Sequence, residues 1–203
     1  MNQPQRRTQE ERSYQTRHKL LDGVISCLIA DGYNSITTPE VCRRSGMSQG
    51  AIFKHFPTKN DLVTAAIGKL YDQLIEVFET TIEHLPPEGD RIQVYLTALW
   101  KLFDTPALLA IYDLRTAART DPALGEALAP LEAQHQQKIR DIAAGLFPDA
   151  ALDPRFFIAV DLILNVIQGA AVGNLTLPDP EFQPQREEAL LTVAHHLLGL
   201  AHE

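Results

Sequence analysis

The chain has 203 residues, of which 45% are hydrophobic and 22% charged, and its formal net charge is −8. This length fits one large or two smaller domains, and the composition excludes a disordered or fibrous protein. The polar first nineteen residues lack the apolar segment of a secretory signal peptide. No apolar run approaches the roughly 18 to 20 residues that span a bilayer, because Asp161 and Asn165 interrupt FFIAVDLILNVI. We therefore expect a cytoplasmic protein with no membrane partner.

Cysteine content and charge distribution bear on whether the protein binds metal or nucleic acid. Cys27 and Cys42 are too few for a disulfide framework and lack the paired spacing of a zinc site, so we expect reduced thiols and no metal. Residues 1–70 hold ten Lys or Arg and six Asp or Glu, net +4, whereas residues 71–203 hold eight and twenty, net −12. A basic N-terminal third can face a phosphate backbone although the whole chain is acidic. Chance segregation of charges on solvated faces gives the same pattern, so charge alone does not decide between a DNA-facing surface and a solvated one.

Helical periodicity runs along the whole chain. Apolar residues at three- and four-residue spacing predict a first helix over 16–30, with Gly32 as its stop. Thr37 or Thr38 caps a short second helix that Gly46 ends. Thr58 and Asp61 resemble a capping box that opens a long helix to about residue 84, where PPEG breaks it. Further helices are predicted over 90–103, 106–118, 122–146, 154–174 and 184–201. Without a strand pattern, the fold is all-α, with about nine helices.

Residues 37–59 predict a helix-turn-helix. A third short helix, SQGAIFKHF, begins at a Ser48 cap and is closed by Pro57, and the glycine in the turn before it permits a sharp bend. On a helical wheel Ile52 and Phe56 face inward, toward Leu28, Val41 and the first helix. The opposite face carries Gly50 and Lys54, flanked by Gln49 and Phe53 on one side and by Ala51 and His55 on the other, and would enter the major groove.

Those residue types suit DNA. Gln49 can pair with an adenine edge, and Lys54 can reach guanine acceptors or a phosphate, while Gly50 allows close approach. Ser48 and Lys59 lie at helix N-termini, where phosphate oxygens are favoured, so they position the protein rather than read sequence.

The segment TRHKLLDGVISCLIADGYNSITTPEVCRRSGMSQGAIFKHFPTKNDLVTAAI resembles the DNA-binding domain of the TetR family of bacterial transcriptional regulators. The likeness lies in the paired leucines, the Gly-Tyr, the Thr-Thr, the Gly-x-Ser turn and the His-Phe followed by Lys. It implies phosphate contacts at Thr38, His55 and Lys59, with base readers at Gln49, Gly50 and Lys54. Phe53 departs from the family's usual tyrosine, so it loses a phosphate contact and can instead touch a sugar or a thymine methyl.

The resemblance also implies a domain plan and partners. Residues 1–15 would be a flexible basic tail that carries Arg6, Arg7 and Arg12. This tail could lie along DNA, but we expect it to be solvated. Residues 16–62 would be the DNA-binding domain, and residues 63–203 the effector-binding and dimerisation domain. The protein would act as a homodimeric repressor on near-palindromic operator DNA and be released by a small-molecule effector. No cofactor is expected.

Beyond residue 70 the candidate residues form two sets. An apolar or aromatic effector would lie between the middle helices, with Arg115 as the partner of an anionic one, although packing in the core explains any single aromatic equally well. The pocket set is Phe78, Trp100, Phe103, Tyr112, Arg115, His135, Asn165 and Gln168. Small residues and an apolar stripe on the last two helices suit a four-helix dimer interface, or equally a monomer core. The interface set is Gly169, Ala170, Gly173, Ala189, Leu190, Val193, Ala194 and Leu197.

Two other classes compete with this interpretation. An enzyme is disfavoured, because His195 and His196 are adjacent and diverge on a helix, and no GxSxG, phosphate loop or HExxH occurs. A helical ligand-binding or partner-binding protein that has lost operator recognition remains open, because Phe53 departs from the family pattern.

Overall fold

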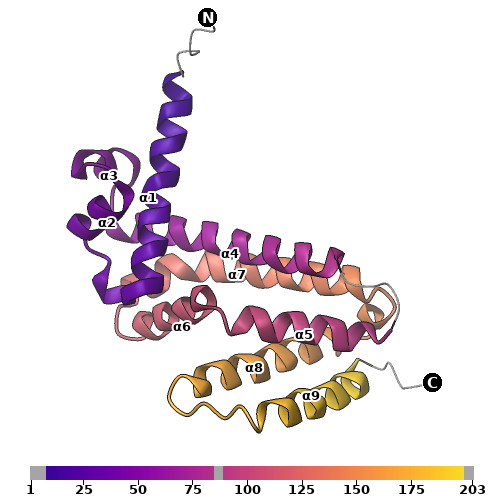
Figure 1. Ribbon diagram of the computed structural model, residues 1–203. Coiled ribbons are helices and arrows are strands. Elements are labelled where there is room, and N and C mark those ends of the chain that lie inside the picture. Colours follow the sequence, from indigo (N-terminus) through magenta and orange to yellow (C-terminus); the bar gives the residue numbers. More distant parts are fainter. Residues whose placement is uncertain (1–7, 85–88, 199–203) are drawn as a thin grey trace, which may run out of the picture. The chain divides into compact units, whose positions relative to one another are not determined.

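The computed structural model describes residues 8–84 and 89–198 (Figure 1). Across those residues the chain forms nine α-helices and two short 3-10 helices, with no strand, so the all-α prediction is confirmed. Both cysteines are free thiols. The predicted break at Pro86 and Pro87 lies outside the described residues, as do Arg6 and Arg7. The elements are α1 (Gln9–Asp31), η1 (Tyr33–Ser35), α2 (Thr38–Ser45), α3 (Gln49–His55), α4 (Lys59–Glu83), α5 (Arg91–Phe103), α6 (Pro106–Ala118), α7 (Pro122–Leu146), η2 (Ala150–Leu152), α8 (Phe156–Asn174) and α9 (Gln183–Leu197).

The first helix begins earlier than its apolar pattern predicts. Thr8 is the N-cap of α1: its backbone N–H donates to Glu11 Oε2 at 2.8 Å, and the Glu11 N–H donates to Thr8 Oγ1 at 3.2 Å. This capping box adds two turns to the helix. Residues 9–15, expected to belong to a flexible tail, are therefore helical. The Thr-x-x-Glu spacing could have shown this, but these turns are exposed and carry no apolar face.

The chain divides into two compact units. One holds the residues up to Asp72 together with Asp113–Leu131, and the other holds Gln73–Tyr112 with the chain from Glu132 onward. The expected single boundary after residue 62 differs from this division. The helices α4, α6 and α7 each contribute to both units, and a boundary inside a helix leaves no break in the apolar periodicity.

Each unit has its own apolar core. In the first, α1 supplies Leu20, Val24 and Leu28, all with at most 1% of their surface exposed. In the second, α5, α8 and α9 pack together, with α8 and α9 side by side (Figure 1). That second core comprises Ile92, Leu96, Trp100, Phe156, Ala159, Ile163, Ile167, Leu190, Ala194 and Leu198.

Candidate nucleic-acid interface

The helices α2 and α3 are short, and side-chain caps fix where each begins. Thr37 Oγ1 accepts the Glu40 N–H at 3.4 Å, and Ser48 Oγ accepts the Ala51 N–H at 3.3 Å. Gly46 ends α2 in the left-handed region, at φ +67°, where a side chain would be strained. The predicted helix, glycine turn and second helix are therefore present.

The inward face of α3 is the predicted one. Ile52 and Phe56 are buried, as are Val41 of α2 and Leu28 of α1. The Arg17 guanidinium lies 4.4 Å from the centre of the Phe56 ring and closes that edge of the core.

The helices α1 and α2 pack closely against each other at Gly23. A Cβ added at Gly23 would lie 2.9 Å from the Ser45 Cβ and 3.2 Å from the Val41 carbonyl oxygen. The Ser45 hydroxyl donates to that same carbonyl at 2.6 Å and accepts the Met47 N–H at 3.2 Å. Ser45 therefore shapes the turn while Gly23 leaves room for it.

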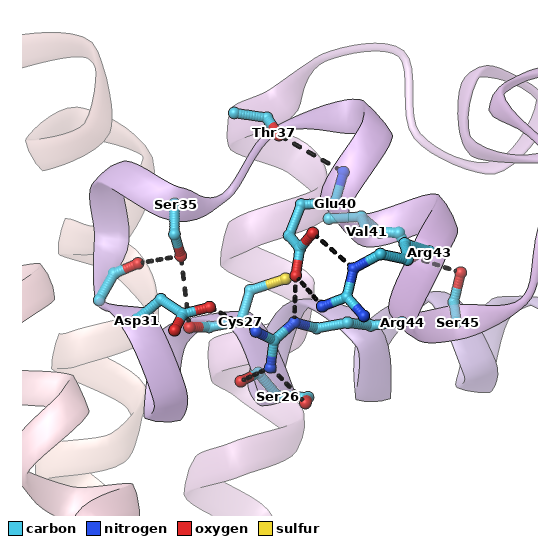
Figure 2. A network of polar contacts seen from close by, with 11 residues as sticks. Ser26, Cys27, Asp31, Ser35, Thr37, Glu40, Val41, Arg43, Arg44 and Ser45 are labelled. Carbon is cyan, nitrogen blue, oxygen red and sulfur yellow. Dashed lines mark hydrogen bonds and ion pairs between the residues drawn. The ribbon is translucent and has the colours of Figure 1, made fainter.

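A polar network holds α2 against the C-terminal end of α1 (Figure 2). Arg44 donates to Glu40 Oε1 at 2.6 Å and to the Ser26 carbonyl oxygen at 2.9 Å, and it forms an ion pair with Asp31. Arg43 donates to both Glu40 oxygens, at 2.8 and 2.5 Å. Because Arg43 and Arg44 hydrogen-bond the carboxylate, the pKa of Glu40 falls to about 2. These two arginines therefore neutralise carboxylates of the scaffold, a role that no sequence motif indicated.

Gly32 and Tyr33 follow α1, and Tyr33 is held by hydrogen bonds to residues that lie far along the chain in the same unit. The Tyr33 N–H donates to Asp113 Oδ2 at 2.8 Å, and the Tyr33 hydroxyl donates to Asp121 Oδ2 at 3.1 Å. The pKa of Tyr33 is raised, mainly because the hydroxyl is buried and also because it donates a hydrogen bond to Asp121. Gly32 has φ +76°, and a Cβ there would lie 2.9 Å from Asp113 Oδ2, so this turn needs glycine.

The outward face of α3 is open for contact. Gln49, Gly50 and Lys54 are exposed, and the Phe53 ring is 56% exposed. A Cβ at Gly50 would meet only the Ser48 hydroxyl, at 4.0 Å, so another molecule can approach the backbone closely. Phe53 is an apolar ring on an otherwise polar face.

The predicted phosphate contacts lie at the start of α2, at the two ends of α3 and at the start of α4. Ser48 is exposed, Thr38 and His55 are half-buried, and Lys59 is the first residue of α4. The Lys59 ammonium lies 4.7 Å from the centre of the Tyr33 ring. Thr58 and Asp61 form the predicted capping box, with backbone bonds of 3.0 and 3.1 Å. None of the eight DNA-contact residues named from sequence is buried, and they lie on α2, on α3 with its cap, and at the start of α4.

The second unit contains a cavity of about 150 Å³. None of the described residues that line it is Lys, Arg, Asp or Glu; Tyr95 and His135 are the lining residues with polar side-chain atoms. The lining residues are Leu74, Ile75, Phe78, Ile92, Tyr95, Leu96, Leu99, Leu102, Phe103, Leu108, His135, Ile139, Ile142, Ala143, Leu146, Phe147, Val160, Ile163, Leu164 and Leu198.

Three of the eight expected pocket residues, Phe78, Phe103 and His135, line this cavity, and five do not. Trp100 and Tyr112 are buried in packing instead. Arg115 belongs to the other unit, where its guanidinium donates to the Tyr71 hydroxyl at 3.3 Å. On α8, Asn165 is exposed and Gln168 half-buried, and neither is part of the lining. The helical period placed these residues on helices correctly but could not give the direction of each side chain.

The expected interface residues on α8 and α9 separate into two groups. Gly169, Gly173, Ala189, Val193 and Leu197 are exposed. In contrast, Leu190 and Ala194 are buried in the core of their own unit, which contradicts their expected place in an interface, and the half-buried Ala170 packs against that core. The exposed group is extended on α8 by Ile158, Leu162, Val166 and Val172, which are 41–61% exposed.

The prediction that no apolar segment is long enough to span a bilayer is wrong for α8. With 19 residues and a mean hydropathy of 1.9, α8 is long and apolar enough to cross a membrane by length and composition alone. The core helix of a soluble protein passes the same test, and one face of α8, carrying Phe156, Ile163 and Ile167, is buried in the core. The apolar character of α8 is therefore weak evidence for a membrane.

The capped helix pair, its glycine turn and its open polar face define a helix-turn-helix DNA-binding protein. Residues 20–66 match the family model described as bacterial regulatory proteins, tetR family. A helix-turn-helix transcriptional regulator of Mycobacterium tuberculosis is 34% identical over 182 residues, which cover 89% of this chain and 93% of that protein. CymR of Pseudomonas putida is 33% identical over 194 residues, with 92% and 93% covered. This chain belongs to the TetR family of transcriptional regulators and is not an enzyme.

Solved structures share the fold. GusR of Salmonella enterica superposes with a TM-score of 0.68 at 21% identity, covering 91% of this chain and 95% of that one. The multidrug binding protein EbrR, solved with imidazole, superposes with a TM-score of 0.66 at 20% identity, covering 89% and 93%. The helical architecture is therefore common to regulators of divergent sequence.

Proposed function

We propose that this regulator is a repressor that binds a near-palindromic operator as a homodimer and leaves it when a small apolar molecule binds. The observation that supports the proposal is that one chain holds both an open reading face on α3 and an apolar cavity in its other unit. It would act in the cytoplasm, where bacterial DNA lies.

On DNA, the outward residues of α3 would divide into two roles. Gln49, Gly50 and Lys54 would meet base edges in the major groove, and the exposed Phe53 ring would pack on a sugar or a thymine methyl. Phosphates would be held by the side chains around them, which fix register without reading sequence. The positioning residues are Thr38, Ser48, His55 and Lys59.

The dimer would form through the exposed apolar face of α8 and α9. Val166 and Val193 are about half exposed, and Gly169 and Gly173 have nothing within 4 Å of an added Cβ, so a second pair of helices can approach closely. An exposed apolar face of this extent is typical of an interface. Two-fold symmetry of the dimer would then appear in the operator.

The cavity favours an uncharged, single-ring effector. A cavity of about 150 Å³ lined by Leu, Ile and Phe accommodates a benzene-sized molecule in other proteins. Without an arginine or lysine in its lining, a buried carboxylate would lose its hydration with little compensation. This replaces the expectation that Arg115 pairs with an anionic effector, because Arg115 is not at the cavity.

Selection of duplexes from a random library by the purified chain tests the operator. We expect enriched sequences to contain two half-sites related by a two-fold axis, with centres about 10 base pairs or a multiple of that apart. Enrichment of one asymmetric site, or of none, would contradict a symmetric dimer on DNA.

Toluene and benzoate test the effector class. Toluene should raise the melting temperature and weaken operator binding, and benzoate should do neither. Ala143→Leu, which fills the cavity, should abolish the toluene effect, whereas Ala144→Leu, at the next α7 position and outside the lining, should keep it. A larger response to benzoate than to toluene, or equal responses from both variants, would reject the neutral-effector proposal.

A further inference from the structure

A second groove lies beside the reading helix, inside the DNA-binding unit. It has a volume of about 750 Å³ and separates the first two turns of α1 from α3. Residues of α3 that line it are Ala51, Lys54 and His55, so it is continuous with the helix-turn-helix surface. The α1 side is formed by Thr8, Gln9, Glu10, Arg12, Ser13 and Thr16.

The nine described residues that line the groove include two cations, Arg12 and Lys54, and three that carry hydroxyl groups. Arg12 and Lys54 are exposed, and His55 is half-buried. Glu10 is the acidic residue of the lining, whereas Glu11 accepts the Thr8 N–H in the capping box. Ser13 and Thr16 add hydroxyl groups, of which the Thr16 hydroxyl donates to the Arg12 carbonyl oxygen at 2.8 Å and keeps its lone pairs available.

The N-terminus of α1 is not the part of this groove that would bind an anion. Thr8 Oγ1 already accepts the Glu11 N–H, and the Glu11 carboxylate faces the same end. The cationic side chains are therefore the groups that can bind an anion, and they stand on two walls of one groove.

We propose that this groove holds a stretch of DNA sugar–phosphate backbone, so that the first two turns of α1 form a second DNA-contacting wall beside α3. Arg12 donates to a phosphate from one wall while Lys54 and His55 approach the same strand from the other. The proposal rests on the DNA binding of the helix-turn-helix and adds to it a part of the chain expected to be a solvated tail.

Two physical arguments favour the backbone over a base edge. The lining offers charge and single hydroxyl groups, which suit phosphate oxygens, whereas base reading needs paired donors and acceptors in one plane. The backbone also lies next to whatever a major-groove helix reads, and Lys54 and His55 belong to both surfaces. Arg12 is therefore a positioning residue that contributes affinity without sequence preference.

Salt-dependent binding of four variants tests the groove. Arg12→Ala should weaken binding to the selected operator and to an unrelated duplex by the same factor, and lower the slope of log affinity against log salt by about 1 per subunit. Arg12→Lys should restore much of the slope. Glu10→Gln should tighten binding, because it removes a negative charge facing the phosphates. Lys19→Ala removes one charge from the same helix outside the groove and should change the slope less than Arg12→Ala.

Methylphosphonate substitution locates the contact. Replacing one phosphate at a time should reveal a position in each half-site that weakens the wild type but not Arg12→Ala. Equal slopes for Arg12→Ala and Lys19→Ala, or no such position, would overturn the groove proposal. If Gln49→Ala still relaxes base preference in that case, the operator-binding proposal stands on its own. Circular dichroism of Arg12→Ala checks that α1 remains helical.

Discussion

Gln49 and Lys59 are both exposed but offer DNA different chemistry. The amide of Gln49 has a donor and an acceptor side by side, whereas Lys59 offers a point charge at the start of α4. We expect Gln49→Ala to relax preference at one base position in each half-site by about 1–3 kcal/mol. Lys59→Ala should weaken all duplexes alike. Binding measured on single-base variants of the operator separates the two, and an identical, sequence-independent loss would refute this division of roles.

Glu40 makes the scaffold sensitive to acid. Its pKa is lowered to about 2 in the folded protein from an ordinary value of 4.5, because Arg43 and Arg44 donate to the carboxylate. A depressed pKa stabilises the fold above the unfolded value and loses that contribution as the pH falls toward 2. Glu40→Gln should therefore be less stable than the wild type at pH 7, and the difference should shrink between about pH 5 and 2.

Urea denaturation at a series of pH values measures this change. Glu79→Gln, at an exposed position on α4, is the matched control and should show a smaller difference at pH 7. A difference between wild type and Glu40→Gln that stays constant down to pH 2 would show that the charge network does not stabilise the scaffold.

Among the elements, α9 shows how one apolar stripe serves two surfaces. Leu190 is 6% exposed and belongs to the core, whereas Val193, three residues further, is 48% exposed. We expect Val193→Asp to leave the helical circular dichroism intact and shift the sedimentation coefficient to that of a monomer. Leu190→Asp should instead cost several kcal/mol and unfold the second unit, because it buries an unpaired charge.

A third substitution serves as the control for this pair. Val77→Asp changes a valine that is 54% exposed on α4 and should leave the sedimentation coefficient unchanged. If Val193→Asp behaves like Val77→Asp, the face of α8 and α9 is not the dimer interface. The structure thus separates the exposed Val193, which we propose for the interface, from the buried Leu190, although the helical period alone placed them together.

At the scale of the whole molecule, the two proposed sites must be linked if ligand binding releases DNA. A ligand changes an equilibrium only as far as it prefers one conformation, and the effect is reciprocal. We expect toluene to weaken operator binding and the operator to weaken toluene binding by the same factor, within about 5- to 150-fold. Titrations of each ligand in the presence and absence of the other measure both factors. Equal affinity for toluene with and without saturating operator would show that the cavity does not control DNA binding.

Local sequence signals were enough to predict the helices and the helix-turn-helix. Caps at Thr37, Ser48 and Thr58 join residues three apart, and Gly46 ends a helix through its own backbone freedom, so these signals are local. The inward direction of Ile52 and Phe56 followed from the helical period in the same way. A local signal for the start of α1 was also present, in Thr8 and Glu11, although the apolar pattern began later.

Contacts between side chains that are distant in the sequence could not be predicted from local signals and became visible in the folded chain. The carboxylates that hold Tyr33 lie 80 and 88 residues away from it, at Asp113 and Asp121, and no spacing rule connects them. The cavity is the space left where side chains of several helices fail to fill their unit, so its lining depends on every packed residue at once. For the same reason the structure assigned Leu190 to the core and Val193 to the surface: a helical period groups residues on a face, but packing against other helices determines which part of that face is buried.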